Sequence, residues 1–121
     1  MPYELWKVVH LIGVIALFSS LGGLAALSLV GRPEASKPFK VLHGVALFVI
    51  FLAGFGLLAK LGMGGPSSWG VWVYVKLGVW LALGAALAFV KSAGRNATAV
   101  LLLCALLGAI AAWAAVAKPG M

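Results

Sequence analysis

The sequence predicts an all-α integral membrane protein, a single domain over residues 1–121 built as an antiparallel four-helix bundle. Composition is the first reason. Of the 121 residues, 64% are hydrophobic and only 9% are charged, and the mean hydropathy is +1.18, which is typical of chains that lie within lipid. The second reason is a succession of four nearly uncharged runs, each close to the ~20 residues that a helix needs to cross a bilayer.

The predicted helices cover residues 5–30, 39–61, 69–91 and 97–117. Pro33 and Pro38 end the helical pattern between the first two, because proline lacks the amide hydrogen that a continuing helix needs. A glycine-rich segment at 62–68 separates the second helix from the third, and a turn at 92–96 separates the third from the fourth. Since the connections are short, consecutive helices should run antiparallel.

The basic residues are divided unequally between the two ends of the predicted bundle. Because cytoplasmic loops carry more Lys and Arg than external ones, the first and third connections should be cytoplasmic and both termini outside, in the inner membrane of a bacterium. The net charge of +7 also raises nucleic acid as a partner. The charges surround both membrane rims without a nucleic-acid motif, however, which favours anionic headgroups of the lipid bilayer. Five basic residues, Arg32, Lys37, Lys40, Lys91 and Arg95, lie beside the first and third connections, and three, Lys7, Lys60 and Lys118, lie at the other end.

The four nearly uncharged runs cover residues 8–30, 41–59, 71–90 and 97–117, and Lys76 is the only charged residue within them. His10 lies at a similar expected depth in the first helix. An ionisable group in hydrocarbon costs at least ~2.5–3.5 kcal/mol, so such residues usually have a partner or a function. Each follows an aromatic residue of the outer interface by seven positions, which places both roughly 10 Å below that interface. His43 enters the membrane from the opposite side. It should therefore lie roughly 15–20 Å from His10 along the membrane normal, too far to share a metal ion.

The surroundings of this histidine and lysine favour a broad, flat ligand. Trp72 and Trp80 lie one helical turn to either side of the lysine and can form the walls of a pocket. Gly13 follows the histidine by three residues, and Gly54 opens a notch at comparable depth in the second helix. Small residues beside a coordinating group leave space for a planar cofactor.

Haem b is therefore the predicted cofactor, with His10 as an axial ligand of the iron. Lys76 would be the second iron ligand or the partner of a haem propionate, and His43 would serve any second haem near the cytoplasmic side. Each residue also has a structural alternative. Both histidines can serve packing, His10 can handle protons, and Lys76 can extend its amine to the interface. The outer aromatic residues can equally form an interfacial belt.

Two segments resemble a known group of small four-helix membrane proteins. The first helix of the HemJ-type protoporphyrinogen oxidases is similar to the run Leu5-Trp6-Lys7-Val8-Val9-His10-Leu11-Ile12-Gly13-Val14, and their later Lys-Leu helix is similar to Val75-Lys76-Leu77. The CopD-like copper-resistance domains and the SirB-type proteins are similar at the same places. The resemblance implies that His10 and Lys76 take part in haem b binding and in activity.

Cys104, Gly108 and Ala112 form a small-residue stripe that predicts close helix packing, either within the bundle or across a dimer. Four short helices rich in Gly and Ala enclose little volume, so we also expect a homodimer through a small-residue face such as this one. The predicted function is haem b binding with redox chemistry or electron transfer at the outer end of the bundle, with quinone or a porphyrin as candidate partner. A HemJ-like porphyrinogen oxidase and a cofactor-free membrane scaffold or transporter-like protein are the alternatives. Activity as an oxidoreductase stays open, because the sequence shows no recognisable nucleophile or general acid–base pair.

Overall fold

The computed structural model describes residues 2–62 and 69–117, in which four long helices and two short 3-10 helices follow one another. Each long helix has the length and the apolar composition needed to cross a membrane. The predicted fold class, an all-α four-helix bundle of membrane-spanning helices, is therefore confirmed. The long helices are α1 (Tyr3–Leu29), α2 (Lys37–Lys60), α3 (Val71–Ser92) and α4 (Ala97–Ala117), and the short ones are η1 (Pro33–Ala35) and η3 (Gly94–Asn96).

The helix bounds differ from the predicted ones by two residues at most, and local backbone chemistry explains the differences. The sequence pattern places Pro38 before the second helix, but α2 already begins at Lys37. Proline fits this first turn because an amide hydrogen there has no partner within the helix. At the end of α1, Gly31 has a φ of 69°, and the Arg32 N–H donates to the Leu27 carbonyl at 2.9 Å. This left-handed glycine closes the helix end.

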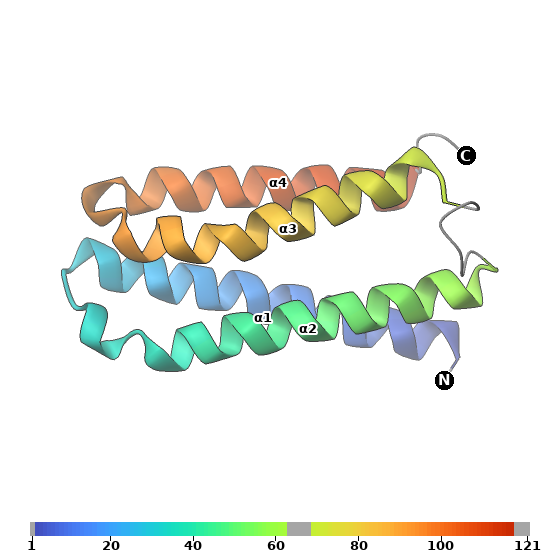
Figure 1. Cartoon of the computed structure of the whole chain (residues 1–121), viewed down its shortest axis with the longest axis horizontal. Helices are drawn as coiled ribbons and strands as arrows, with labels where there is room; N and C mark the ends of the chain where they lie inside the picture. The colour runs from blue at the N-terminus through green and yellow to red at the C-terminus, as the bar shows by residue number, and fades with distance from the viewer. Residues whose placement is uncertain (1, 63–68, 118–121) are drawn as a thin grey trace.

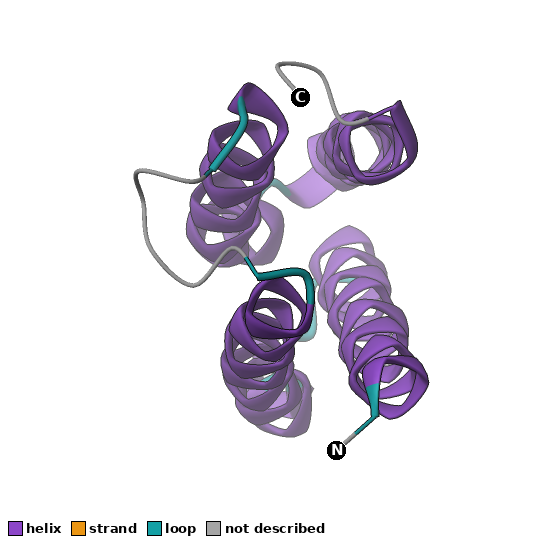
Figure 2. Ribbon diagram, turned by 90° about the vertical axis from the view of Figure 1, so that its right-hand side faces the viewer, coloured by secondary structure: helices purple, strands orange, loops and turns teal. Residues whose placement is uncertain are grey.

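The four helices form two antiparallel pairs. The start of α1 and the end of α4 lie at the same end of the bundle, which we call the terminal end (Figure 1). The opposite end carries η1 and η3 and is called the basic end. Seen from the terminal end, α1 lies beside α2 and α3 beside α4, at the four corners of the bundle (Figure 2). Packing is closest within these two pairs, and α1 also contacts α3 and α4.

Buried side chains form one large cluster toward the basic end and a smaller one at the terminal end. The large cluster draws on all four helices and includes Leu21, Ala46, Leu83 and Cys104. A hydrogen bond of 2.7 Å from the Gly94 N–H to the Ser28 hydroxyl also fastens η3 to the end of α1. The small cluster comprises Leu58, Trp72, Val73 and Ala114, from α2, α3 and α4.

Two hydrogen bonds join α2 and α3 near the middle of the bundle. The Nε2 of His43 on α2 donates to the Leu83 carbonyl at 3.1 Å, and the indole N–H of Trp80 on α3 donates to the Leu47 carbonyl at 3.1 Å. Polar groups at membrane depth need such partners because no water is available to them. From this point toward the terminal end, α2 and α3 diverge (Figure 1).

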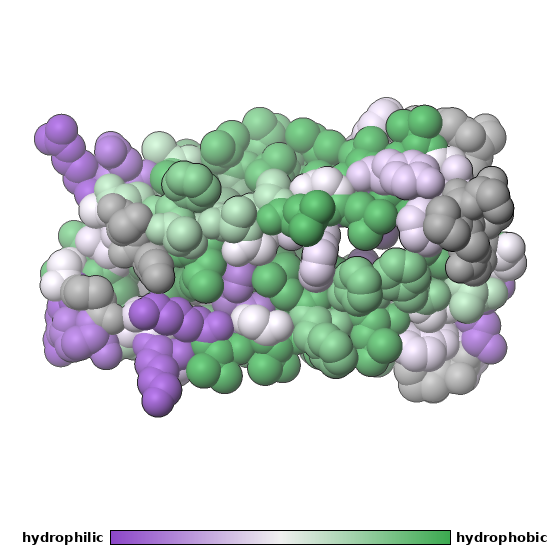
Figure 3. All heavy atoms as spheres, in the orientation of Figure 1, coloured by the Kyte–Doolittle hydropathy of each residue, from purple (hydrophilic) through white to green (hydrophobic). Residues whose placement is uncertain are grey.

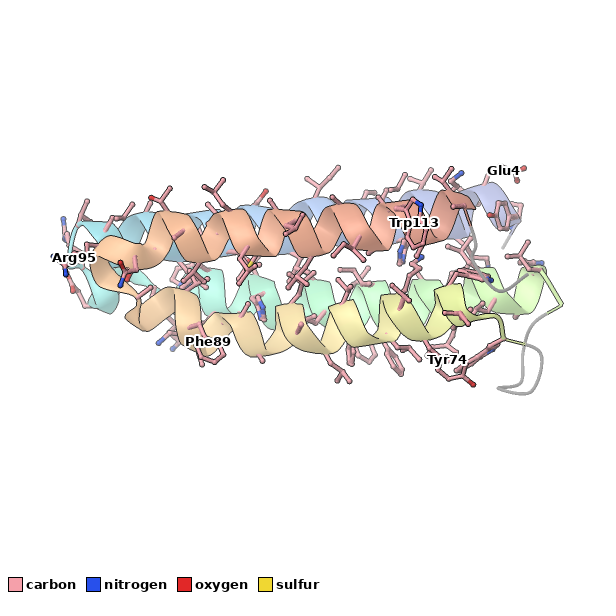
Figure 4. All side chains as sticks on the ribbon, turned by 90° about the horizontal axis from the view of Figure 1, so that it is seen from above. Glu4, Tyr74, Phe89, Arg95 and Trp113 are labelled. Atoms are coloured by element: carbon pink, nitrogen blue, oxygen red, sulfur yellow. The ribbon has the colours of Figure 1, made fainter. Side chains whose placement is uncertain are left out.

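The outer surface of the bundle is apolar over its middle, and hydrophilic residues gather at the basic end (Figure 3). Large side chains such as Phe48 and Phe89 are exposed there, and Figure 4 shows Phe89 pointing away from the helices. In a membrane protein this is the surface that contacts lipid. Tyr74 and Trp113 lie toward the terminal end (Figure 4) and are more than half exposed, as residues of an interfacial belt are.

The small-residue stripe of Cys104, Gly108 and Ala112 packs within the bundle at its first two positions, which is one of its two predicted roles. Cys104 is only 2% exposed. A Cβ at Gly108 would lie 2.6 Å from the ring of Phe18 on α1, so this glycine allows α4 to approach α1. Ala112 lines a cavity between the helix pairs. Ala112 is also exposed, and dimerisation stays a prediction.

Candidate functional site

A cavity of about 420 Å³ lies between the α1–α2 pair and the α3–α4 pair, in the terminal half of the bundle. Its volume falls within the range of roughly 300–1,000 Å³ that is usual for small-molecule sites. All four helices contribute to its wall, which is mainly apolar. Figure 3 shows an opening between α2 and α3 in this half, surrounded by hydrophobic residues. Five of the predicted ligand residues line the cavity: His10, Gly54, Trp72, Lys76 and Trp80.

His10 reaches the cavity from α1, and a hydrogen bond sets the orientation of its ring. The Nδ1 atom lies 3.3 Å from the carbonyl oxygen of Ile50 on α2. A carbonyl only accepts, so Nδ1 carries the proton and donates it in this bond. In the neutral ring, Nε2 then keeps a lone pair for a ligand. Metal-bound histidines commonly show this arrangement, with one nitrogen on the metal and the other donating to a backbone carbonyl.

The two predicted glycines have different roles. Gly54 lies against the imidazole, since a Cβ there would be 3.8 Å from Cε1 of His10. Gly13 is buried and lies outside the cavity wall. A Cβ at Gly13 would lie 2.9 Å from the Ile50 Cγ1 and 3.3 Å from the Ile50 backbone nitrogen. Gly13 therefore allows α1 and α2 to approach closely, which corrects its predicted role as a ligand contact.

The α3 wall carries a lysine between two tryptophans. Lys76 lines the same cavity as His10. Trp72 is only 5% exposed and belongs to the small core cluster, so it faces the interior instead of the lipid interface. The indole N–H of Trp80 is held by its hydrogen bond to α2. Both indoles are thus fixed as parts of the wall.

Aromatic rings follow one another along the same side of the bundle as the opening. The ring of Phe51 on α2 lies 5.0 Å from that of Trp80 on α3 and 4.7 Å from that of Phe55. Phe55 lies 5.8 Å from Trp69, and Trp69 lies 5.6 Å from Tyr74. Tilted and edge-on contacts at these distances are favourable arrangements for aromatic pairs. These contacts form a row of aromatic rings along α2 and the first half of α3, beside the cavity.

Lys7 also lines the cavity, although its sequence position indicates only a place at the membrane rim. It precedes His10 by three residues, and this spacing puts both on one face of α1. That spacing is the signal that could have identified it. Glu4 is exposed and points away from the bundle (Figure 4), and Glu34 pairs with Arg32 at the basic end at 3.1 Å. The described cavity wall therefore carries two lysines and a histidine but no carboxylate.

His43 lies outside this site. It is 2% exposed and serves the contact between α2 and α3 through its bond to Leu83. His10 faces the part of α2 between Ile50 and Gly54, which is seven to eleven residues beyond His43, or roughly 10–16 Å along the helix. The two histidines thus lie at different levels. Within the described ranges, no group of three or more His, Cys, Asp or Glu side chains could hold a metal ion.

Comparisons with protein-family models, with curated proteins and with solved structures find no match to this chain. The resemblance to the HemJ-type proteins stays a prediction.

Proposed function

We propose that the protein binds haem b in this cavity and transfers single electrons at the terminal end of the bundle. The observation that carries the proposal is the orientation of His10. Its Nδ1 proton is engaged by the Ile50 carbonyl, so Nε2 is the nitrogen that would bind haem iron. The ring lies in a cavity whose wall is mainly apolar and includes two indoles.

The nitrogen ligands of the cavity wall suit iron that is already held in a porphyrin better than they suit a free metal ion. The wall offers one imidazole and the amines of two lysines, whereas sites for free transition-metal ions combine several His, Cys or carboxylate ligands. A porphyrin supplies the equatorial nitrogen ligands itself, and the protein adds only axial groups. Trp72 and Trp80 offer flat apolar surfaces of the kind that enclose planar ligands.

Haem, when bound, supplies a reversible one-electron couple. His10 would hold the iron, and the Ile50 carbonyl would keep the imidazole in the required orientation and tautomer. The apolar walls would exclude water and so influence the redox potential. Lys76 would act either as the second axial ligand or on a propionate.

The proposed setting is the inner membrane of a bacterium, with the terminal end and both termini outside. The support is the excess of basic residues at the basic end, five against three at the terminal end. In this orientation the opening between α2 and α3 lies in the outer leaflet. A membrane-soluble redox partner such as a quinone would then approach the cavity from the lipid.

The test is the absorption spectrum of the protein purified in mild detergent from cells supplied with a haem precursor. A Soret band with visible bands that sharpen on reduction is the expected result. A colourless protein that also fails to take up added haem would overturn the proposal and leave the scaffold or transporter-like alternative. A HemJ-type enzyme would be recognised by oxidation of protoporphyrinogen by the purified protein.

A further inference from the structure

The cavity wall carries a surplus of positive charge. Lys7 and Lys76 both line it together with His10, and none of the described lining residues is acidic. The chain has only two acidic side chains in all. Glu4 points away from the bundle, and Glu34 pairs with Arg32 at the basic end. Charges interact more strongly near the membrane interior than in water because the local dielectric constant is lower. A wall of this composition therefore favours an anionic ligand.

Both lysine side chains can extend toward the terminal end from the level of the histidine. α1 and α3 both begin at the terminal end, and the Cα–Cβ bonds of a helix tilt toward its N-terminus. Lys7 lies about 4.5 Å nearer to that end than His10 along α1. Lys76 has a flexible aliphatic stem that allows its amine to extend toward the interface. Both amines can therefore reach the rim of the cavity, and its deeper part is lined mainly by apolar groups.

The remainder of the cavity suits an apolar body. Trp72, Trp80 and Phe51 form its walls, and the opening between α2 and α3 lies among hydrophobic residues (Figure 3). An apolar molecule can therefore reach the cavity from the lipid without crossing water. A ligand with a planar apolar body and an acidic edge would match both parts of the site.

We propose that Lys7 and Lys76 form a carboxylate-binding pair, which selects planar apolar ligands with acid groups on one edge and turns that edge toward the terminal end. The inference rests on the proposed function insofar as it concerns the same cavity. It assigns Lys76 to an acid group instead of to iron, it adds Lys7 to the site, and it does not require a metal in the ligand.

Metal-free protoporphyrin IX and its dimethyl ester are suitable probes. They differ in whether the propionates are charged, and neither offers an iron to His10. Binding is measured by porphyrin fluorescence with the full chain in phosphatidylcholine nanodiscs, which contain no anionic lipid to compete. Each probe also partitions into the lipid, to the same extent for every variant. The measured quantity is therefore the affinity for the acid divided by the affinity for the ester, called the acid-to-ester ratio, and it is compared with the same ratio for nanodiscs without protein. Wild-type protein should raise this ratio about a hundredfold, because each of the two charge-assisted contacts contributes about tenfold.

Lys7→Met and Lys76→Met should each lower the ratio about tenfold, and the double variant should return it to that of protein-free nanodiscs. Lys60→Met is the matched control, because Lys60 is exposed at the same end but lies outside the cavity wall, and it should leave the ratio unchanged. An unchanged ratio in Lys7→Met would overturn the proposal. So would an equal loss of affinity for both probes in the lysine variants, which would indicate a role in packing.

His10→Ala separates this inference from the proposed function. If haem ligation by His10 is correct, the variant should lose iron-porphyrin binding while its acid-to-ester ratio for the metal-free probes stays high. If wild-type protein binds no haem but shows the acid preference, the proposed function fails and the carboxylate-binding pair stands. Haem binding without any acid preference would refute the pair alone.

Discussion

Gly13→Ala tests whether close approach of α1 and α2 positions the histidine. The added Cβ would lie 2.9 Å from Cγ1 and 3.3 Å from the backbone nitrogen of Ile50. The side chain can turn away, but the backbone nitrogen can move only if α2 moves. Ile50 is also the residue whose carbonyl accepts the hydrogen bond from His10. Displacement of α2 at this point should therefore lengthen that bond and free the imidazole to rotate.

The expected magnitude follows from a matched control. Overpacking of a tight contact typically costs about 1–3 kcal/mol, whereas replacing glycine by alanine inside a helix contributes up to about 1 kcal/mol of stability. A Cβ at Gly44 on α2 would meet nothing within 4 Å, so Gly44→Ala carries the helix-propensity gain alone. The difference between the two variants should therefore equal the overpacking cost, about 1–3 kcal/mol.

The assay is reversible unfolding in mixed micelles of increasing SDS content, followed by circular dichroism. The Nδ1–H signal of His10 in nitrogen-15 NMR spectra reports the hydrogen bond, and it should shift or broaden in Gly13→Ala but not in Gly44→Ala. If Gly13→Ala is as stable as Gly44→Ala and keeps the wild-type signal, the packing account of Gly13 is refuted.

Three further predictions concern residues away from the cavity wall. His43→Ala should lower the free energy of unfolding by about 1–3 kcal/mol, because it empties a buried position and removes the hydrogen bond to Leu83. The amount of porphyrin bound per folded protein should stay at the wild-type level, and a loss of porphyrin would show that His43 belongs to a porphyrin site. Cys104 should resist maleimide in intact membranes because it is buried, whereas it should react after the protein is unfolded in SDS, and equal labelling before and after unfolding would contradict the burial. A periplasm-dependent reporter fused after Met121 should be active, and a fusion active only with a cytoplasmic reporter would invert the proposed orientation.

The number of helices and their bounds were predictable because bilayer thickness sets the length of each apolar run. The depth of a residue in the membrane was predictable because each helix rises by a fixed length per residue. Counting along a helix put His10 and Lys76 at one level, and the structure brings them to one cavity. The separate level of His43 followed from its entry on the opposite side.

The rotation of each helix about its axis was much harder to predict. Lipid and helix interior are both apolar, so these helices lack the polar face that orients a helix in a soluble protein. The sequence therefore predicts a ligand contact at Gly13 and leaves open whether Gly108 packs within the bundle or across a dimer. In the structure each glycine accommodates a neighbouring helix. Lys7 illustrates the converse. Its position near the rim matched an ordinary interfacial lysine, and only its spacing from His10 indicated the cavity.

The central claim is that Nε2 of His10 binds haem iron. The most direct measurement is the Soret band of His10→Gly, with and without added imidazole, at equal amounts of protein with wild-type helix content. The account predicts that the variant loses the band and that imidazole restores it, because the free ring can occupy the vacated space and supply the same nitrogen. A wild-type Soret band in His10→Gly without imidazole would contradict the claim.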